Sequence, residues 1–161
     1  EKISGEDFVS ECQVESDLEL LFPNEYIPSS SERMLLYREL HGLELDKDLL
    51  DSKARSEDRF GELPPEGQER LRIVPLRRLA KRLGAEKIFL KAGRMSLFFV
   101  SNPDSPYYQS AAFGKVIGYM GRNPRFCNRR EMNGKRSMVV KNVENVETAV
   151  SILQEIVSME G

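Results

Sequence analysis

Apolar residues recur at the three- and four-residue spacing of an amphipathic helix in five stretches of the chain. Met34, Leu35, Tyr37 and Leu40 are the predicted contacts of the first stretch, and Leu49 and Leu50 those of the second. Serines before the first stretch supply caps, and glycines follow the first three. The predicted helices span about residues 29–42, 46–58, 65–83, 107–120 and 143–159.

Pro75 lies inside the third of these stretches. An interior proline lacks the amide hydrogen that the helix needs, and it costs about 3 kcal/mol. The third helix is therefore predicted either to kink or to divide into two short helices that meet near Val74.

Short apolar runs between the helices predict strands. The first alternates weakly, as an edge strand does, and the next two flank Ala92-Gly93 as a hairpin whose second strand is predicted to be buried on both faces. The last two flank Asn133-Gly134, a dipeptide suited to a two-residue turn. The order β-α-α-α-β-β-α-β-β-α predicts an α+β fold with helices packed on two mostly antiparallel β-hairpin elements. The predicted strands span residues 12–20, 87–90, 95–100, 125–127 and 138–141.

A chain of 161 residues with 40% hydrophobic content can bury one core. We expect a linker remnant at residues 1–10 and one domain at residues 11–161. No apolar stretch approaches the roughly 20 residues that cross a bilayer, so a soluble protein with no membrane partner is expected. Cys12 and Cys127 lie far apart in no metal-binding spacing, which predicts reduced thiols, a cytoplasmic location and no metal site.

The charge of the chain is divided unevenly. Residues 1–66 carry 18 acidic and 7 basic side chains, whereas residues 67–161 carry 8 and 17. One interpretation is an acidic face for a basic partner and a basic face for nucleic acid or an acidic partner. The other is that two complementary halves pack together and leave solvated faces.

The run from Asp58 to Pro65, DRFGELPP, combines opposite charges, an aromatic residue, a helix-ending glycine and two prolines that open the next helix. Charges beside an aromatic anchor suit docking onto another protein. Asp58 is unfavourable at a helix C-terminus, which suggests a specific partner. The alternative is a pair with Arg55 or Arg59 inside the chain, worth less than about 1 kcal/mol if exposed.

A basic cluster brackets the Asn133-Gly134 turn, and a basic β-ribbon can follow a phosphate backbone. No known nucleic-acid motif accompanies it, and the sequence pI is 5.6. The hairpin is therefore an alternative functional site, a nucleic-acid contact through Arg122, Arg125, Arg129, Arg130, Lys135 and Arg136.

No catalytic residue is indicated. His41 precedes a glycine at a predicted helix end, where an imidazole bonds a free carbonyl, and a small hydrolase would have to bring it together with Cys12 or Cys127. Gly114-Lys115 lacks the upstream glycine and the following Ser or Thr of a phosphate loop.

Four runs resemble a known family in order, spacing and residue type. They are PNEYIP at residues 23–28, ERMLLYR at 32–38, EDRFGELP at 57–64 and LRRLAKRLG at 76–84. The chain resembles the C-terminal (TRCF) domain of the bacterial transcription-repair coupling factor, Mfd. The resemblance implies that residues 11–161 are a regulatory domain of a large ATP-driven DNA translocase, which displaces stalled RNA polymerase and recruits the excision-repair protein UvrA.

The resemblance also implies partners and roles. The domain is expected to be non-catalytic, with no cofactor of its own, while ATP and magnesium bind the motor of the parent and DNA is reached through the parent. It is expected to dock on the UvrB-like N-terminal module of the same chain and to mask its UvrA-binding surface. Asp58 and Arg59 are expected to make polar contacts to that module, with Phe60 and Gly61 shaping the helix exit. Arg55 stands where members often carry Glu.

Overall fold

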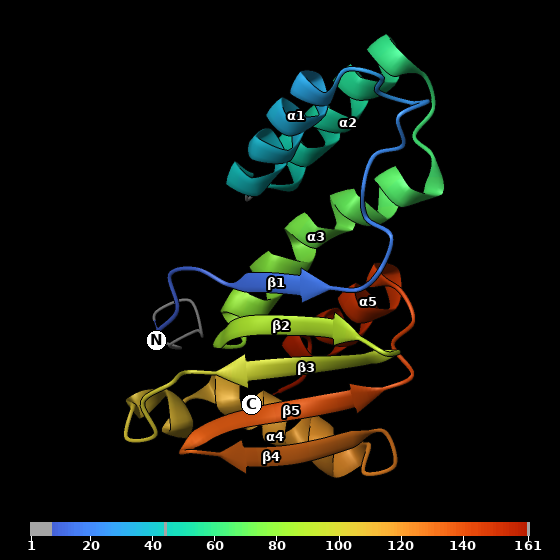
Figure 1. The fold of residues 1–161 in the computed structure, drawn as a ribbon. Coiled ribbons are helices and arrows are strands. Elements are labelled where there is room, and N and C mark those ends of the chain that lie inside the picture. Colours follow the sequence, from blue (N-terminus) through green and yellow to red (C-terminus); the bar gives the residue numbers. More distant parts are fainter. Residues whose placement is uncertain (1–7, 44, 161) are drawn as a thin grey trace. The chain divides into compact units, whose positions relative to one another are not determined.

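The structure is a computed structural model that describes residues 8–43 and 45–160, except for the side chain of Met132. The order of its elements confirms the predicted order, with one short 3-10 turn, η2, added before α4 (Figure 1). The elements are β1 (Gln13–Ser16), α1 (Ser30–Gly42), α2 (Asp46–Phe60), α3 (Pro65–Arg82), β2 (Ala85–Lys91), β3 (Arg94–Phe99), η2 (Pro106–Gln109), α4 (Ala111–Arg122), β4 (Cys127–Met132), β5 (Lys135–Lys141) and α5 (Val146–Val157).

The chain divides into two compact units. The helical unit comprises residues 19–75, and the sheet unit comprises residues 1–18 and 76–161. The helix α3 contributes to both, since the division falls between Pro75 and Leu76. Residues 1–7 of the predicted linker lie outside the described residues, so the linker and the bounds of the domain stay a prediction.

The sheet unit contains one five-stranded sheet with the order β1-β2-β3-β5-β4. β1 pairs in parallel with β2 and lies at an edge, as predicted, and the other neighbours are antiparallel. The predicted hairpins are β2–β3 and β4–β5, and pairing of β3 with β5 joins them. Each turn uses two residues with positive φ, Ala92 and Gly93 in one and Asn133 and Gly134 in the other. The α+β class is confirmed, with the two hairpins united in one sheet.

The two faces of the sheet differ in burial. Figure 1 shows α4 and α5 behind the sheet, and on that face Phe99 packs against Phe113 of α4 with ring centroids 6.0 Å apart. Burial along β3 alternates, because Ser96 and Phe98 point to the other side and are only half-buried. The prediction that this strand is buried on both faces is therefore wrong. The face that α4 and α5 leave uncovered is called the open face below.

The helical unit has its own core, formed where the segment before α1 packs with α1, α2 and the first part of α3. The Tyr37 hydroxyl accepts a hydrogen bond from the Phe22 amide at 2.8 Å, which fixes the extended entry segment. Ser29 caps α1 by accepting from the Glu32 amide at 3.3 Å, as its sequence predicts. The fully buried members are Phe22, Ile27, Leu40, Leu63, Leu71 and Val74.

Four predicted elements need correction. α3 is one helix through Pro75, so its division into two short helices is wrong; buried Leu71, Val74 and Leu76 flank the proline and offset the lost bond. The predicted helix at 107–120 begins at 111, because Ser110 caps it by accepting from the Phe113 amide. The strands predicted at 125–127 and 138–141 are β4 and β5, which span residues 127–132 and 135–141; β4 is a polar edge strand without apolar alternation, and the polar residues that begin β5 extend it beyond the predicted apolar run.

Candidate partner-binding site

The run that contains Asp58 closes α2. Gly61 has φ +93°, which favours glycine, and its amide donates to the Glu57 carbonyl at 2.9 Å. The Tyr26 hydroxyl donates to the Gly61 carbonyl at 2.8 Å, and the rings of Tyr26 and Phe60 lie 5.7 Å apart. Burial, with a further contribution from the charge of Glu57, raises the pKa of Tyr26, so this donor keeps its proton. Phe60 and Gly61 therefore fix the place where α2 ends.

The two arginines of the site pair across to α1. The Arg55 guanidinium donates to Glu39 at 2.7 Å, and the Ser52 hydroxyl donates to the other oxygen of the same carboxylate at 2.7 Å. Arg59 pairs with Glu32 and lies over the Phe60 ring, 5.1 Å from its centroid. Both arginines therefore form ion pairs with acidic residues of α1.

Asp58 is left without either arginine. Its side chain is exposed and forms no hydrogen bond or ion pair with any residue that the structure describes. The alternative that Asp58 pairs with Arg55 or Arg59 is not what the structure shows. An unpaired carboxylate near the negative end of a helix is locally unfavourable, which leaves it open to a cation from outside the chain.

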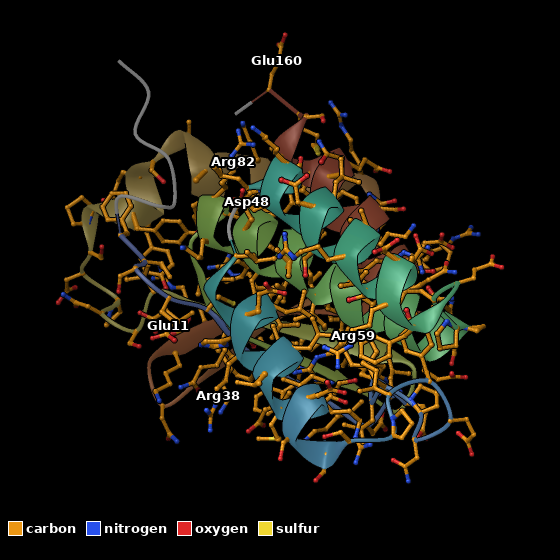
Figure 2. All side chains as sticks on the ribbon, turned by 90° about the horizontal axis from the view of Figure 1, so that it is seen from above. Glu11, Arg38, Asp48, Arg59, Arg82 and Glu160 are labelled. Carbon is orange, nitrogen blue, oxygen red and sulfur yellow. The ribbon has the colours of Figure 1, made fainter. Side chains whose placement is uncertain are left out.

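Apolar side chains accompany these charges. Glu32, Leu35 and Glu39 follow a spacing of three and four residues, so they share one side of α1 and Leu35 lies between the two ion pairs. Leu35 is 62% exposed and Leu50 of α2 is 66% exposed. In Figure 2 the labels of Arg59 on α2 and Arg38 on α1 mark the two helices that carry this surface. We call this surface the hairpin face, formed by the exposed residues Leu35, Leu50, Ala54, Arg55, Asp58 and Arg59 of α1 and α2.

Sequence periodicity did not find these exposed apolar residues. Met34, Leu35 and Leu50 were predicted as contacts of their helices, and each is exposed. The predicted contacts Tyr37, Leu40 and Leu49 do pack in the core, and Leu36 joins them. A signal existed in α1, because four consecutive apolar residues from Met34 to Tyr37 cannot all lie on one stripe of a helix.

The basic cluster of the second hairpin does not gather on one face. Arg130 and Lys135 lie on the open face, whereas Arg129 stands opposite the buried Met138. The Arg136 guanidinium lies 4.2 Å from the Tyr108 ring centroid, and its buried Nε has no hydrogen-bond partner among the described residues. Arg122 ends α4 and Arg125 precedes β4. These side chains do not form a single stripe along a phosphate backbone.

The side chains considered for a hydrolase or a phosphate loop lie in environments that do not suit those roles. Burial raises the pKa of Cys12 to about 12 and that of Cys127 to about 11, so both thiols are protonated near neutral pH and are poor nucleophiles. His41 lies in the last turn of α1, as predicted. Lys115 lies within α4 and donates to the Val157 carbonyl at 3.0 Å, away from any phosphate-loop geometry.

Two features are absent from the part of the chain that the structure describes. It contains no group of three or more His, Cys, Asp or Glu residues placed to hold a metal ion. None of its helices is long and apolar enough to cross a membrane.

Comparisons with known proteins agree on one fold. A solved structure described as the crystal structure of the C-terminal domain of transcription-repair coupling factor superposes with a TM-score of 0.69 at 15% identity, covering 91% of this chain and 93% of that one. The mixed α+β arrangement of a five-stranded sheet and helices is therefore the fold of that class of domain.

The sequence itself identifies the family. The family model of the TRCF domain matches residues 16–110, so the chain belongs to the TRCF domain family. It is 33% identical over 86 residues to the transcription-repair-coupling factor of Escherichia coli K12, and 33% identical over 78 residues to that of Staphylococcus epidermidis RP62A. These matches cover 53% and 48% of this chain but only 8% and 7% of the relatives, so the chain spans a small part of their length.

Proposed function

We propose that this chain is a non-catalytic, autoinhibitory interaction domain of a transcription-repair coupling factor, and that its hairpin face docks on the UvrB-like N-terminal module of the same protein. In the docked state it masks the surface of that module which binds UvrA. The parent is an ATP- and magnesium-dependent DNA translocase that displaces stalled RNA polymerase, and the masking role needs no contact of this domain's own with polymerase or DNA. Its place of action is the cytoplasm.

The observation that carries the proposal is the composition of the hairpin face. It joins exposed Leu35 and Leu50 to the unpaired carboxylate of Asp58 and to two exposed ion pairs. Exposed ion pairs add less than about 1 kcal/mol to stability, so the fold does not depend on them. A partner can compete for Arg55 and Arg59 at little cost, while the leucines supply apolar contact area.

Charged contacts of this kind suit a reversible mask. The closed state has to be more stable than the open state by only a few kcal/mol for a partner to switch the equilibrium. Charges at the rim of an interface contribute specificity and salt-sensitive rates more than affinity. Family membership supports the setting, because the relatives are transcription-repair-coupling factors. The position of Arg55, where members often carry Glu, gives this chain its own charge pattern at the interface.

The test is the affinity of the full-length parent for UvrA, compared between wild type and Asp58→Ala/Arg59→Ala. Loss of the two charges opens the mask and tightens UvrA binding about tenfold, which corresponds to about 1.4 kcal/mol. The control Glu25→Ala/Arg82→Ala removes the same two charges at exposed positions that are not among the residues of the hairpin face, and it leaves the affinity unchanged. Equal UvrA affinity in all three proteins would contradict the masking role.

A further inference from the structure

The open face of the sheet carries a row of basic side chains. Strand register places Lys91, Arg94 and Lys141 side by side across β2, β3 and β5. Like charges directly opposite one another destabilise a sheet, so the row needs a reason other than stability. Lys91 lies 3.8 Å from Glu15, while the side chains of Arg94 and Lys141 form no hydrogen bond or ion pair with a described residue.

The rest of this face is also basic. The register brings three more basic residues to it from β2, β4 and β5, against two acidic strand residues, Glu15 of β1 and Glu86 at the irregular start of β2. These additional basic residues are Lys87, Arg130 and Lys135. The face therefore attracts an extended anion rather than a single ion.

Two phenylalanines occupy the central strands of the same face. Phe89 and Phe98 are half-buried, and their rings meet edge to face with centroids 5.5 Å apart. They line an open hollow of about 460 Å³ together with Gln13, Lys87, Lys135 and Ser101. Two carboxylates, Glu11 and Glu86, lie at the same hollow, and Glu86 accepts a hydrogen bond from Ser101. Flat apolar rings beside lysines are the components of a stacking site for bases.

We propose that the open face binds single-stranded nucleic acid, with Phe89 and Phe98 stacking on bases and Lys91, Arg94 and Lys141 holding phosphates. A duplex hides the faces of its bases, and the carboxylates of an acidic peptide carry no ring. A single strand offers in every nucleotide both a flat ring for the phenylalanines and a phosphate for the basic row. The function goes beyond the docking of the hairpin face, whose residues all belong to the helical unit.

The lysines around Phe89 are compatible with this occupant. The ammonium groups of Lys87 and Lys91 lie 4.6 and 4.9 Å from the Phe89 ring centroid. A base stacked on the ring contributes more than an exposed cation–π contact, and flexible lysines can move aside to the phosphates. Binding thus replaces weak contacts within the chain by stronger ones to the strand.

The experiment measures fluorescence anisotropy of a labelled oligothymidylate of about a dozen nucleotides, titrated with this chain across a salt series. Lys91→Gln/Arg94→Gln/Lys141→Gln is expected to weaken binding and to reduce the slope of log affinity against log salt by about 2, since each phosphate of a single strand that a basic side chain neutralises contributes about 0.7. Phe89→Ala is expected to weaken binding about tenfold with the slope unchanged, and Phe89→Trp to retain it. Circular dichroism shows that each variant is folded.

The control Arg38→Gln/Lys47→Gln/Lys53→Gln removes the same charge from the helical unit and is expected to bind like wild type. Absence of binding at low salt overturns the proposal. It is also overturned if the control weakens binding equally, or if only Arg122→Gln/Arg125→Gln/Arg129→Gln does so. Tighter binding of polyglutamate than of the oligonucleotide would instead assign the face to an acidic protein.

Discussion

Alanine substitutions at Gly84 and Gly134 form a matched pair that tests how tightly the sheet unit is packed around Tyr107. Both have positive φ, +82° and +77°, so alanine at either position meets the same kind of backbone strain. The space around them differs. A Cβ at Gly84 would lie 2.1 Å from Cε1 of Tyr107, whereas a Cβ at Gly134 meets nothing within 4 Å.

Tyr107 cannot move aside easily. Its ring is fully buried, its hydroxyl donates to the Leu83 carbonyl, and it packs against the rings of Phe99 and Phe113 with centroids 6.3 and 5.5 Å away. Alanine in the left-handed region costs about 1–2 kcal/mol. Overpacking adds about 1–3 kcal/mol, so Gly84→Ala is expected to destabilise by about 2–5 kcal/mol and Gly134→Ala by about 1–2 kcal/mol.

The assay is urea unfolding monitored through the amide hydrogen exchange of β2 and β3. These strands report on the sheet unit alone, because the two compact units can unfold separately. The difference between the two variants isolates the contact with Tyr107 from the shared backbone strain. Equal loss of stability in both variants would refute the reasoning, because it would mean that the ring yields to the new methyl group without cost.

Three other perturbations have defined outcomes. Raising the pH from 9 toward 11 is expected to lower the free energy of unfolding by about 1.4 kcal/mol per pH unit for each buried thiol, because folded Cys12 and Cys127 keep protons that the unfolded chain releases. The dependence of this free energy on pH should be weaker in Cys12→Ala/Cys127→Ala. An identical dependence in the variant and the wild type would contradict the prediction. Asn145→Ala is expected to cost about 1 kcal/mol by thermal melting, since its side chain accepts from the Thr148 amide at 2.7 Å and caps α5, while Asn145→Asp should keep the stability. Arg55→Ala is expected to change stability by less than about 1 kcal/mol, as measured by urea unfolding, and a loss of several would show that the pair with Glu39 supports the fold.

Local chemistry predicted the elements well. The Asn133-Gly134 turn, the Ser29 cap and the glycine end of α2 at Gly61 each act within a few residues, and each is where the sequence indicates. Local signals of this kind could not predict which strands pair when they lie far apart in the sequence. The parallel pairing of β1 with β2 and the union of β3 with β5 join segments far apart in sequence, and hydrophobic alternation does not encode the choice of neighbour.

The candidate site was predicted in part for the same reason. The residues around Asp58 lie in one short run of the sequence, but the partners of Arg55 and Arg59 come from α1 and depend on how the two helices meet. The exposure of Leu35 and Leu50 depends on the same rotation of each helix about its axis. A sequence pattern gives the period of an apolar stripe, while tertiary packing decides which members of a crowded stripe are left outside.

The most direct measurement is binding of this chain to the separately expressed UvrB-like module by titration calorimetry across a salt series. The account predicts saturable binding that salt weakens and that Asp58→Ala/Arg59→Ala and Leu50→Asp each reduce, whereas Leu21→Asp, at an equally exposed leucine away from the hairpin face, leaves it intact. Binding that is insensitive to the hairpin-face variants, or no binding at any salt concentration, would contradict the claim that this face is the docking surface.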